Sequence, residues 1–97
     1  MKSNLDYNTL LKRDPDQLFS FLDNEIVMLS VQNGEYYNLD SIGSYIWLLL
    51  KKPCTFKELI VHLVNTFEVD EETCINDTKS FIEESIDKGL IQKTNER

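Results

Sequence analysis

The hydrophobic positions of the chain follow the period of a strand first and that of a helix afterwards. Residues 25–31, EIVMLSV, are rich in Ile and Val and suit a strand. Both faces of this strand are apolar, which indicates that it is central or lies under another element. Asn33-Gly34 tolerates positive φ, so residues 35–39, EYYNL, should return antiparallel to it.

A further strand is indicated ahead of this hairpin. Residues 17–22, QLFSFL, are mostly apolar, and the turn-forming residues Asp23 and Asn24 follow them. We therefore expect a small antiparallel sheet of two to three N-terminal strands, with residues 35–39 at its edge.

The edge strand has two different faces. Period-two spacing puts Tyr37 and Leu39 on one face, and Tyr36 and Asn38 on the other. Leu39 indicates that its own face is directed toward the core.

A first helix is predicted over residues 41–51. Asp40 or Ser41 is placed to cap it, and Pro53 ends it. The apolar positions recur at intervals of three and four: Ile42, Tyr45, Ile46, Leu49 and Leu50.

Two more helices follow. Thr55 and Glu58 form a capping box that begins a helix reaching about residue 67. Asp70 caps a third helix that continues to about residue 88. The order of elements predicts an α+β, winged-helix-like fold, in which the small sheet packs on a three-helix cluster.

Both ends of the chain are expected to be tails. Residues 1–14 are polar with sparse Leu and Tyr, and we interpret them as a flexible N-terminal tail. Gly89 ends the third helix, and Leu90-Ile91 should fold back onto the core. The folded domain is then residues 15–91, followed by a polar tail over residues 92–97.

Charge and composition exclude several classes of function. The 97 residues carry a net charge of −7, which opposes binding to nucleic acid. The longest apolar run, IWLLL at 46–50, is too short to cross a bilayer, and the first dozen residues lack a signal peptide. We therefore expect a cytoplasmic protein without a membrane or nucleic-acid partner.

The sequence offers no evident catalytic or metal-binding set. Cys54 and Cys74 are far apart, and His62 falls within a helical pattern, so we expect free thiols and no zinc site. There is no glycine-rich phosphate loop among three glycines. We accordingly expect no enzymatic activity and no cofactor.

The strand over residues 35–39 suggests a different role. It contains no proline, and an uncovered edge can accept a peptide as an additional strand. The alternative is that Tyr36 and Tyr37 merely complete a core sheet.

Residues 22–91 resemble the PqqD-like family of peptide-recognition domains. The resemblance rests on an apolar strand, the run NGEYYNLD, a G-x-x-IW helix start, a Thr-capped helix and a C-x-x-D-x-x-x-FI helix that ends in GLI. The residues of the two helix motifs are Gly43, Ile46, Trp47, Cys74, Asp77, Phe81 and Ile82.

Within that family, the run YYNLD-x-IGS-x-IW is most similar to the stand-alone leader-binding proteins of lasso-peptide biosynthesis. The resemblance implies a non-enzymatic protein that binds the leader of a ribosomally made precursor peptide and delivers it to a leader peptidase. A role as the leader-binding subunit of another peptide-modifying enzyme, of radical or cyclodehydratase type, stays open as an alternative. So do a DNA-binding winged helix and a scaffold subunit.

The resemblance also implies where the leader binds: as an added strand, in a cleft against the third helix. Carried over by position, the peptide-binding residues are Glu35, Tyr36, Tyr37, Asn38, Leu39, Ile75, Lys79, Ile82 and Ile86. The opposite flank of the helix, with Asp77, Glu84 and Lys88, is the competing choice. Trp47 is expected in the core, and pairing of two copies through the edge strand would give a homodimer.

Overall fold

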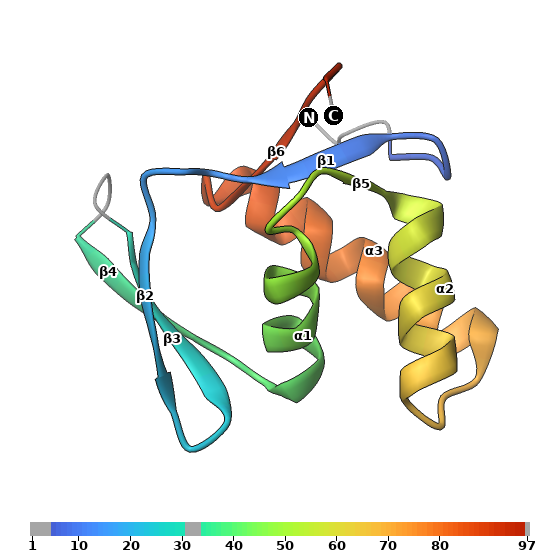
Figure 1. Ribbon diagram of the computed structural model, residues 1–97, viewed down its shortest axis with the longest axis horizontal. Helices are drawn as coiled ribbons and strands as arrows, with labels where there is room; N and C mark the ends of the chain where they lie inside the picture. Colours follow the sequence, from blue (N-terminus) through green and yellow to red (C-terminus); the bar gives the residue numbers. More distant parts are fainter. Residues whose placement is uncertain (1–4, 31–33, 97) are drawn as a thin grey trace.

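The computed structural model describes residues 5–30 and 34–96 and shows two small sheets beside three helices (Figure 1). The elements, in chain order, are β1 Leu10–Arg13, β2 Leu18–Leu22, β3 Glu25–Ser30, β4 Glu35–Leu39, α1 Ser41–Leu49, β5 Cys54–Thr55, α2 Phe56–Thr66, α3 Glu71–Asp87 and β6 Ile91–Lys93. The α+β class expected from the sequence is confirmed.

The expected N-terminal sheet is the three-stranded sheet β2-β3-β4. Asp23 and Asn24 have φ of 52 and 73, and they join β2 to β3 in a two-residue turn that leaves Leu22 opposite Glu25. Gly34 has φ +68 before β4, whereas the rest of the expected Asn33-Gly34 turn lies outside the described residues.

The second sheet, β5-β1-β6, corrects the expectation of tails at both ends of the chain. Leu11 in β1 is 0% exposed, and it lies opposite Cys54 of β5 and Lys93 of β6. The backbone N–H of Asp14 then donates to the carbonyl of Leu90 (2.9 Å). The tail predictions are wrong here because strands this short gain their backbone partners from distant segments of the chain.

The helices begin where the caps predict. The Asp40 side chain accepts from the N–H of Gly43 (2.7 Å), and Thr55 and Glu58 form the expected capping box. Gly43 lets α1 approach α3 closely, since a Cβ at this position would lie 3.1 Å from Phe81 Cε1.

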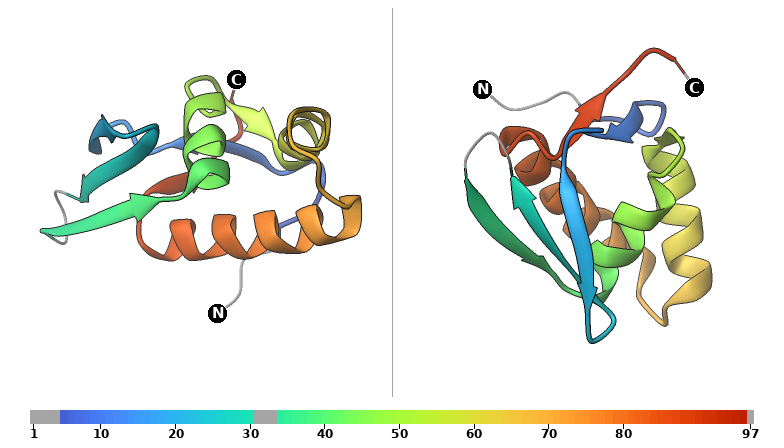
Figure 2. Two further views of the ribbon diagram at one scale, coloured as in Figure 1. Left: turned by 90° about the horizontal axis from the view of Figure 1, so that it is seen from below. Right: turned by 60° about the vertical axis from the view of Figure 1, so that its left-hand side comes forward.

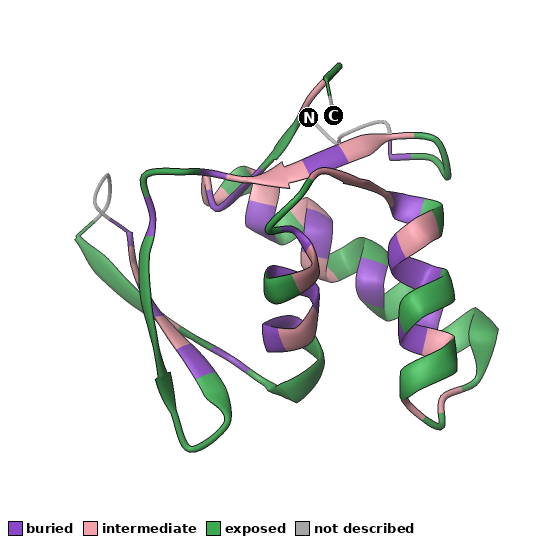
Figure 3. Cartoon of the chain, in the orientation of Figure 1, coloured by how far each residue is buried: buried purple, intermediate pink, exposed green. Residues whose placement is uncertain are grey.

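The core lies between the helices and the inner face of each sheet (Figure 3). Trp47 is 1% exposed, which confirms it as a core residue, and Leu39 is buried as predicted. The largest fully buried apolar side chains are Trp47, Leu11, Ile26, Met28, Ile46, Leu50, Leu59, Leu63, Ile82 and Ile91.

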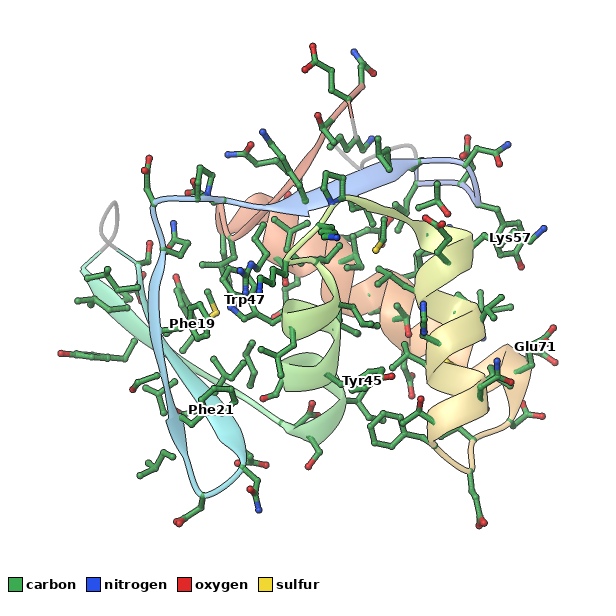
Figure 4. The ribbon with its side chains drawn as sticks, in the orientation of Figure 1. Phe19, Phe21, Tyr45, Trp47, Lys57 and Glu71 are labelled. Atoms are coloured by element: carbon green, nitrogen blue, oxygen red, sulfur yellow. The ribbon has the colours of Figure 1, made fainter. Side chains whose placement is uncertain are left out.

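Arg13 of β1 lies over the rings of Phe19 in β2 and Trp47 in α1, both of which are labelled in Figure 4. Its guanidinium lies 5.2 Å from the ring centroid of Phe19 in β2 and 5.1 Å from that of Trp47 in α1. It also donates to the carbonyl of Trp47 (3.4 Å). Burial lowers the pKa of the Arg13 guanidinium from its usual value, and the two aromatic rings offset that desolvation.

Candidate functional site

Strand β4 forms one end of its sheet. It pairs with β3 along one edge, and no described strand pairs with its other edge. The C-terminal part of α3 lies near this free edge, and residues of both elements line one hollow (Figure 2). The expected edge position of residues 35–39 is therefore confirmed.

A buried hydroxyl shows which backbone groups of β4 point toward β3. Ser44 Oγ accepts from the N–H of Ile26 (2.9 Å) and donates to the carbonyl of Leu39 (3.1 Å). It sits between two backbone groups that face each other across the β3–β4 pair. The two-residue β2–β3 turn gives the same alternation, since the residues that flank such a turn are hydrogen-bonded to each other.

The alternation fixes the outward groups of β4. Because the backbone N–H and C=O groups of Leu39 point toward β3, those of Tyr37 and Glu35 do as well. The N–H and C=O groups of Tyr36 and Asn38 then point to the outer edge. No described residue pairs with that edge, so those groups are available to an added strand.

A groove of about 320 Å³ separates this edge from α3. Its floor and far wall contain apolar and small side chains, among them Phe81 and Ser85. The full lining is Tyr36, Tyr37, Asn38, Leu39, Asp40, Phe81, Glu84, Ser85, Lys88 and Leu90. The groove thus offers main-chain partners on one side and side-chain contacts on the other.

Opposite charges lie at the mouth of the groove. Lys88 Nζ is 3.3 Å from Glu84 Oε1 and 4.8 Å from the ring centroid of Tyr37. Both charged side chains are well exposed, so the ion pair contributes little to stability. The cation instead keeps the Tyr37 ring beside the C-terminal turn of α3.

A second hollow, of about 350 Å³, continues the groove between α1 and α3. Asp40, Phe81 and Glu84 line both spaces. Ile42 and Ile46 supply apolar surface in the second hollow. A bound segment that leaves β4 can therefore continue along α3.

The structure brings most of the predicted strand residues to the groove, but not the predicted helix residues. Tyr36, Tyr37, Asn38 and Leu39 line it, whereas Glu35 does not.

The four helix residues lie elsewhere. Ile82 is 0% exposed in the core, and Ile75 lines a separate hollow with α2. Lys79 is exposed and Ile86 is half-buried, and neither lines the groove. The competing flank faces β4 instead, through Glu84 and Lys88, while its third member, Asp77, lines only the second hollow.

Sequence reasoning placed Phe81 in a family motif and did not assign Ser85 or Leu90 to the site. The signal that could have found Phe81 and Ser85 is their spacing with Lys88, which places them on the same flank of α3 as Glu84. Leu90 enters the groove only because the chain turns after Gly89, whose φ is 77.

The described residues contain no group of three or more His, Cys, Asp or Glu side chains that could hold a metal ion. None of the helices in the described part of the chain is long and apolar enough to span a bilayer.

Two solved structures of proteins in complex with leader peptides resemble this chain. A TbiB1 protein in complex with the TbiA(beta) leader peptide is 28% identical, with a TM-score of 0.77, and the match covers 88% of this chain and 99% of that one. A lasso peptide synthetase B1 complexed with the leader peptide is 19% identical, with a TM-score of 0.71, over 84% of this chain and 96% of that one. At that identity, the second match shows the fold alone.

A third solved structure shares the fold. It is the PqqD truncation of Methylobacterium extorquens PqqCD, described as a stand-alone recognition element for ribosomally synthesised and post-translationally modified peptides. It is 14% identical, with a TM-score of 0.74, over 91% of this chain and 94% of that one. No curated protein gives a significant match.

The family itself is shown by sequence. The family described as coenzyme PQQ synthesis protein D matches residues 25–91. The matched part runs from the start of β3 through α3 to the first residue of β6, so it includes β4, the groove and all three helices. The chain belongs to the PqqD family.

Proposed function

We propose that this protein binds the leader segment of a ribosomally synthesised precursor peptide by β-strand addition to β4. The observation that carries the proposal is the outer edge of β4, with which no described strand pairs, beside a groove against α3. Two solved proteins of similar fold were captured with leader peptides, which supports the same class of ligand here.

The outward groups of Tyr36 and Asn38 provide the backbone contacts. Four added hydrogen bonds contribute about 1 kcal/mol each, and one or two apolar anchors contribute about 1.5–3 kcal/mol each. Ordering a flexible peptide costs about 2–5 kcal/mol. The difference is at most about 8 kcal/mol, which corresponds to reversible binding with a dissociation constant that is micromolar or weaker. Such affinity suits a protein that holds a peptide and then releases it.

The protein itself then needs no catalytic residues. It presents the bound leader to a partner leader peptidase of lasso-peptide biosynthesis, and the partner carries the chemistry. The similarity of the run YYNLD-x-IGS-x-IW to the stand-alone leader-binding proteins of lasso-peptide biosynthesis supports the lasso-type assignment over other peptide-modifying systems.

A pair of substitutions on α3 tests the site. Phe81→Ala removes a half-buried ring from the groove, and we expect it to weaken leader binding about tenfold, the equivalent of about 1.4 kcal/mol. Ile75→Ala removes a half-buried apolar side chain from the same helix but outside the groove, and it should leave affinity unchanged.

The measurement is fluorescence polarisation with a labelled synthetic leader of the precursor encoded beside this gene. Saturable binding by the wild-type chain, weakened in the Phe81 variant alone, supports the site. If the wild-type chain shows no saturable binding, the proposed function is wrong. If the Ile75 variant loses affinity and the Phe81 variant does not, the leader lies on the other flank of α3.

A further inference from the structure

The outer face of the β2-β3-β4 sheet is mostly apolar, with Ser20, Glu25 and Asn38 as its polar members, and no described residue covers it. Cross-strand partners share a face, so Leu18, Leu29 and Tyr36 form one row of it. Leu18 is 59% exposed, Leu22 is 63% exposed and Tyr36 is 73% exposed. Figure 3 shows β2 exposed along its length. We define the outer face as Leu18, Leu22, Val27, Leu29 and Tyr36.

The outer face is also concave. A shallow hollow of about 230 Å³ lies over it, and its lining includes Leu18, Val27, Leu29 and Tyr36. Exposed apolar side chains that are contiguous on a surface mark a site of interaction more often than scattered ones do. The opposite face of the same sheet already packs against the core through Ile26 and Met28.

The acidic residues around the outer face favour a basic partner. The sequence has no Lys or Arg between Arg13 and Lys51, although it has carboxylates throughout that stretch. The acidic residues there are Asp14, Asp16, Asp23, Glu25, Glu35 and Asp40. Those on and next to the strands, Asp16, Asp23, Glu25 and Glu35, are exposed. A second copy of this sheet, an anionic membrane or a nucleic acid would meet like charge, whereas a protein patch ringed by Lys and Arg would be attracted.

We infer that the outer face docks the enzyme that acts on the bound leader, through a patch on that enzyme with an apolar centre and a basic rim. The inference rests on the proposed function. Tyr36 lines both the peptide groove and the hollow on the outer face. A protein seated on this face therefore lies directly beside an added strand at β4. That position places the leader and its enzyme on adjoining surfaces of one sheet.

The test is the double variant Leu18→Thr with Leu22→Thr. Thr keeps β-propensity while removing apolar surface, so the strand should persist. We expect the affinity for the purified partner leader peptidase to fall about 30-fold. Leader affinity should stay unchanged, because neither residue lines the groove. The matched control is Val61→Thr, a residue that is 50% exposed on α2 and should leave both affinities unchanged.

The role of charge is tested separately with Glu25→Lys, which should weaken enzyme binding about fivefold. Added salt should also weaken the binding of the enzyme to the wild-type chain. Both measurements use biolayer interferometry with the purified enzyme and the full chain. Equal enzyme affinity of the double variant and the wild type overturns the inference. The inference is also wrong if the wild type forms a dimer in sedimentation velocity and the double variant does not, because the outer face would then bind a second copy of the chain. If the leader binds and the enzyme does not, the docking surface is wrong while the proposed function stands.

Discussion

Replacing Asn38 with proline is expected to weaken leader binding about 30-fold, or about 2 kcal/mol, while the fold remains intact. The N–H of Asn38 points to the outer edge of β4, so its loss removes a bond to the added strand and none to β3. The proline ring also occupies space that the incoming backbone needs. An edge strand tolerates proline at such a position. The leader titration measures the affinity, and thermal unfolding measures the fold.

Two controls separate this effect from damage to the strand. Asn38→Thr keeps the N–H and should bind the leader much more tightly than the proline variant does. Tyr37→Pro places the same ring where the backbone faces Met28 of β3, and it should destabilise the sheet itself. Wild-type affinity in a well-folded Asn38→Pro variant would contradict strand addition at β4.

Ser44→Ala is expected to lower the free energy of unfolding by about 3 kcal/mol. Ser44 is 4% exposed, and its hydroxyl bridges the N–H of Ile26 and the carbonyl of Leu39. Its removal leaves two backbone groups without this partner in a site that water does not reach, and an unsatisfied buried group costs about 1–3 kcal/mol. Urea denaturation followed by circular dichroism measures the loss.

The matched control for Ser44 is Ser80→Ala, an exposed serine in α3. Alanine favours a helix at least as well, so this variant should be as stable as the wild type or slightly more so. If Ser44→Ala costs no more than Ser80→Ala, the hydroxyl does not hold the end of β4 against β3.

Local signals in the sequence predicted most of the elements. The capping box of Thr55 and Glu58, the cap at Asp40 and the left-handed Gly89 are each set by neighbouring residues, so they could be identified without the fold. The alternation of β4 likewise placed Leu39 toward the core. The sheet β5-β1-β6 could not be found this way, because Leu11 gains its strand partners from segments far along the chain.

For a related reason, the sequence alone did not show which residues of α3 line the groove. An apolar stripe gives the direction of the core only approximately, and Phe81 and Ile82 are adjacent on it. The core takes Ile82, and the packing of α3 against α2 and β6 turns Phe81 and Lys88 toward β4. The rotation of a helix about its axis depends on all its neighbours, which a single sequence does not specify.

Amide hydrogen exchange distinguishes pairing of a leader strand with the outer edge of β4 from binding elsewhere on the protein. Exchange is followed by NMR on the labelled chain, alone and saturated with leader. We expect the leader to slow exchange at Tyr36 and Asn38 strongly, and at Leu39 much less, since the Leu39 amide already faces β3. Saturable leader binding that leaves the exchange of Tyr36 and Asn38 unchanged would contradict this pairing.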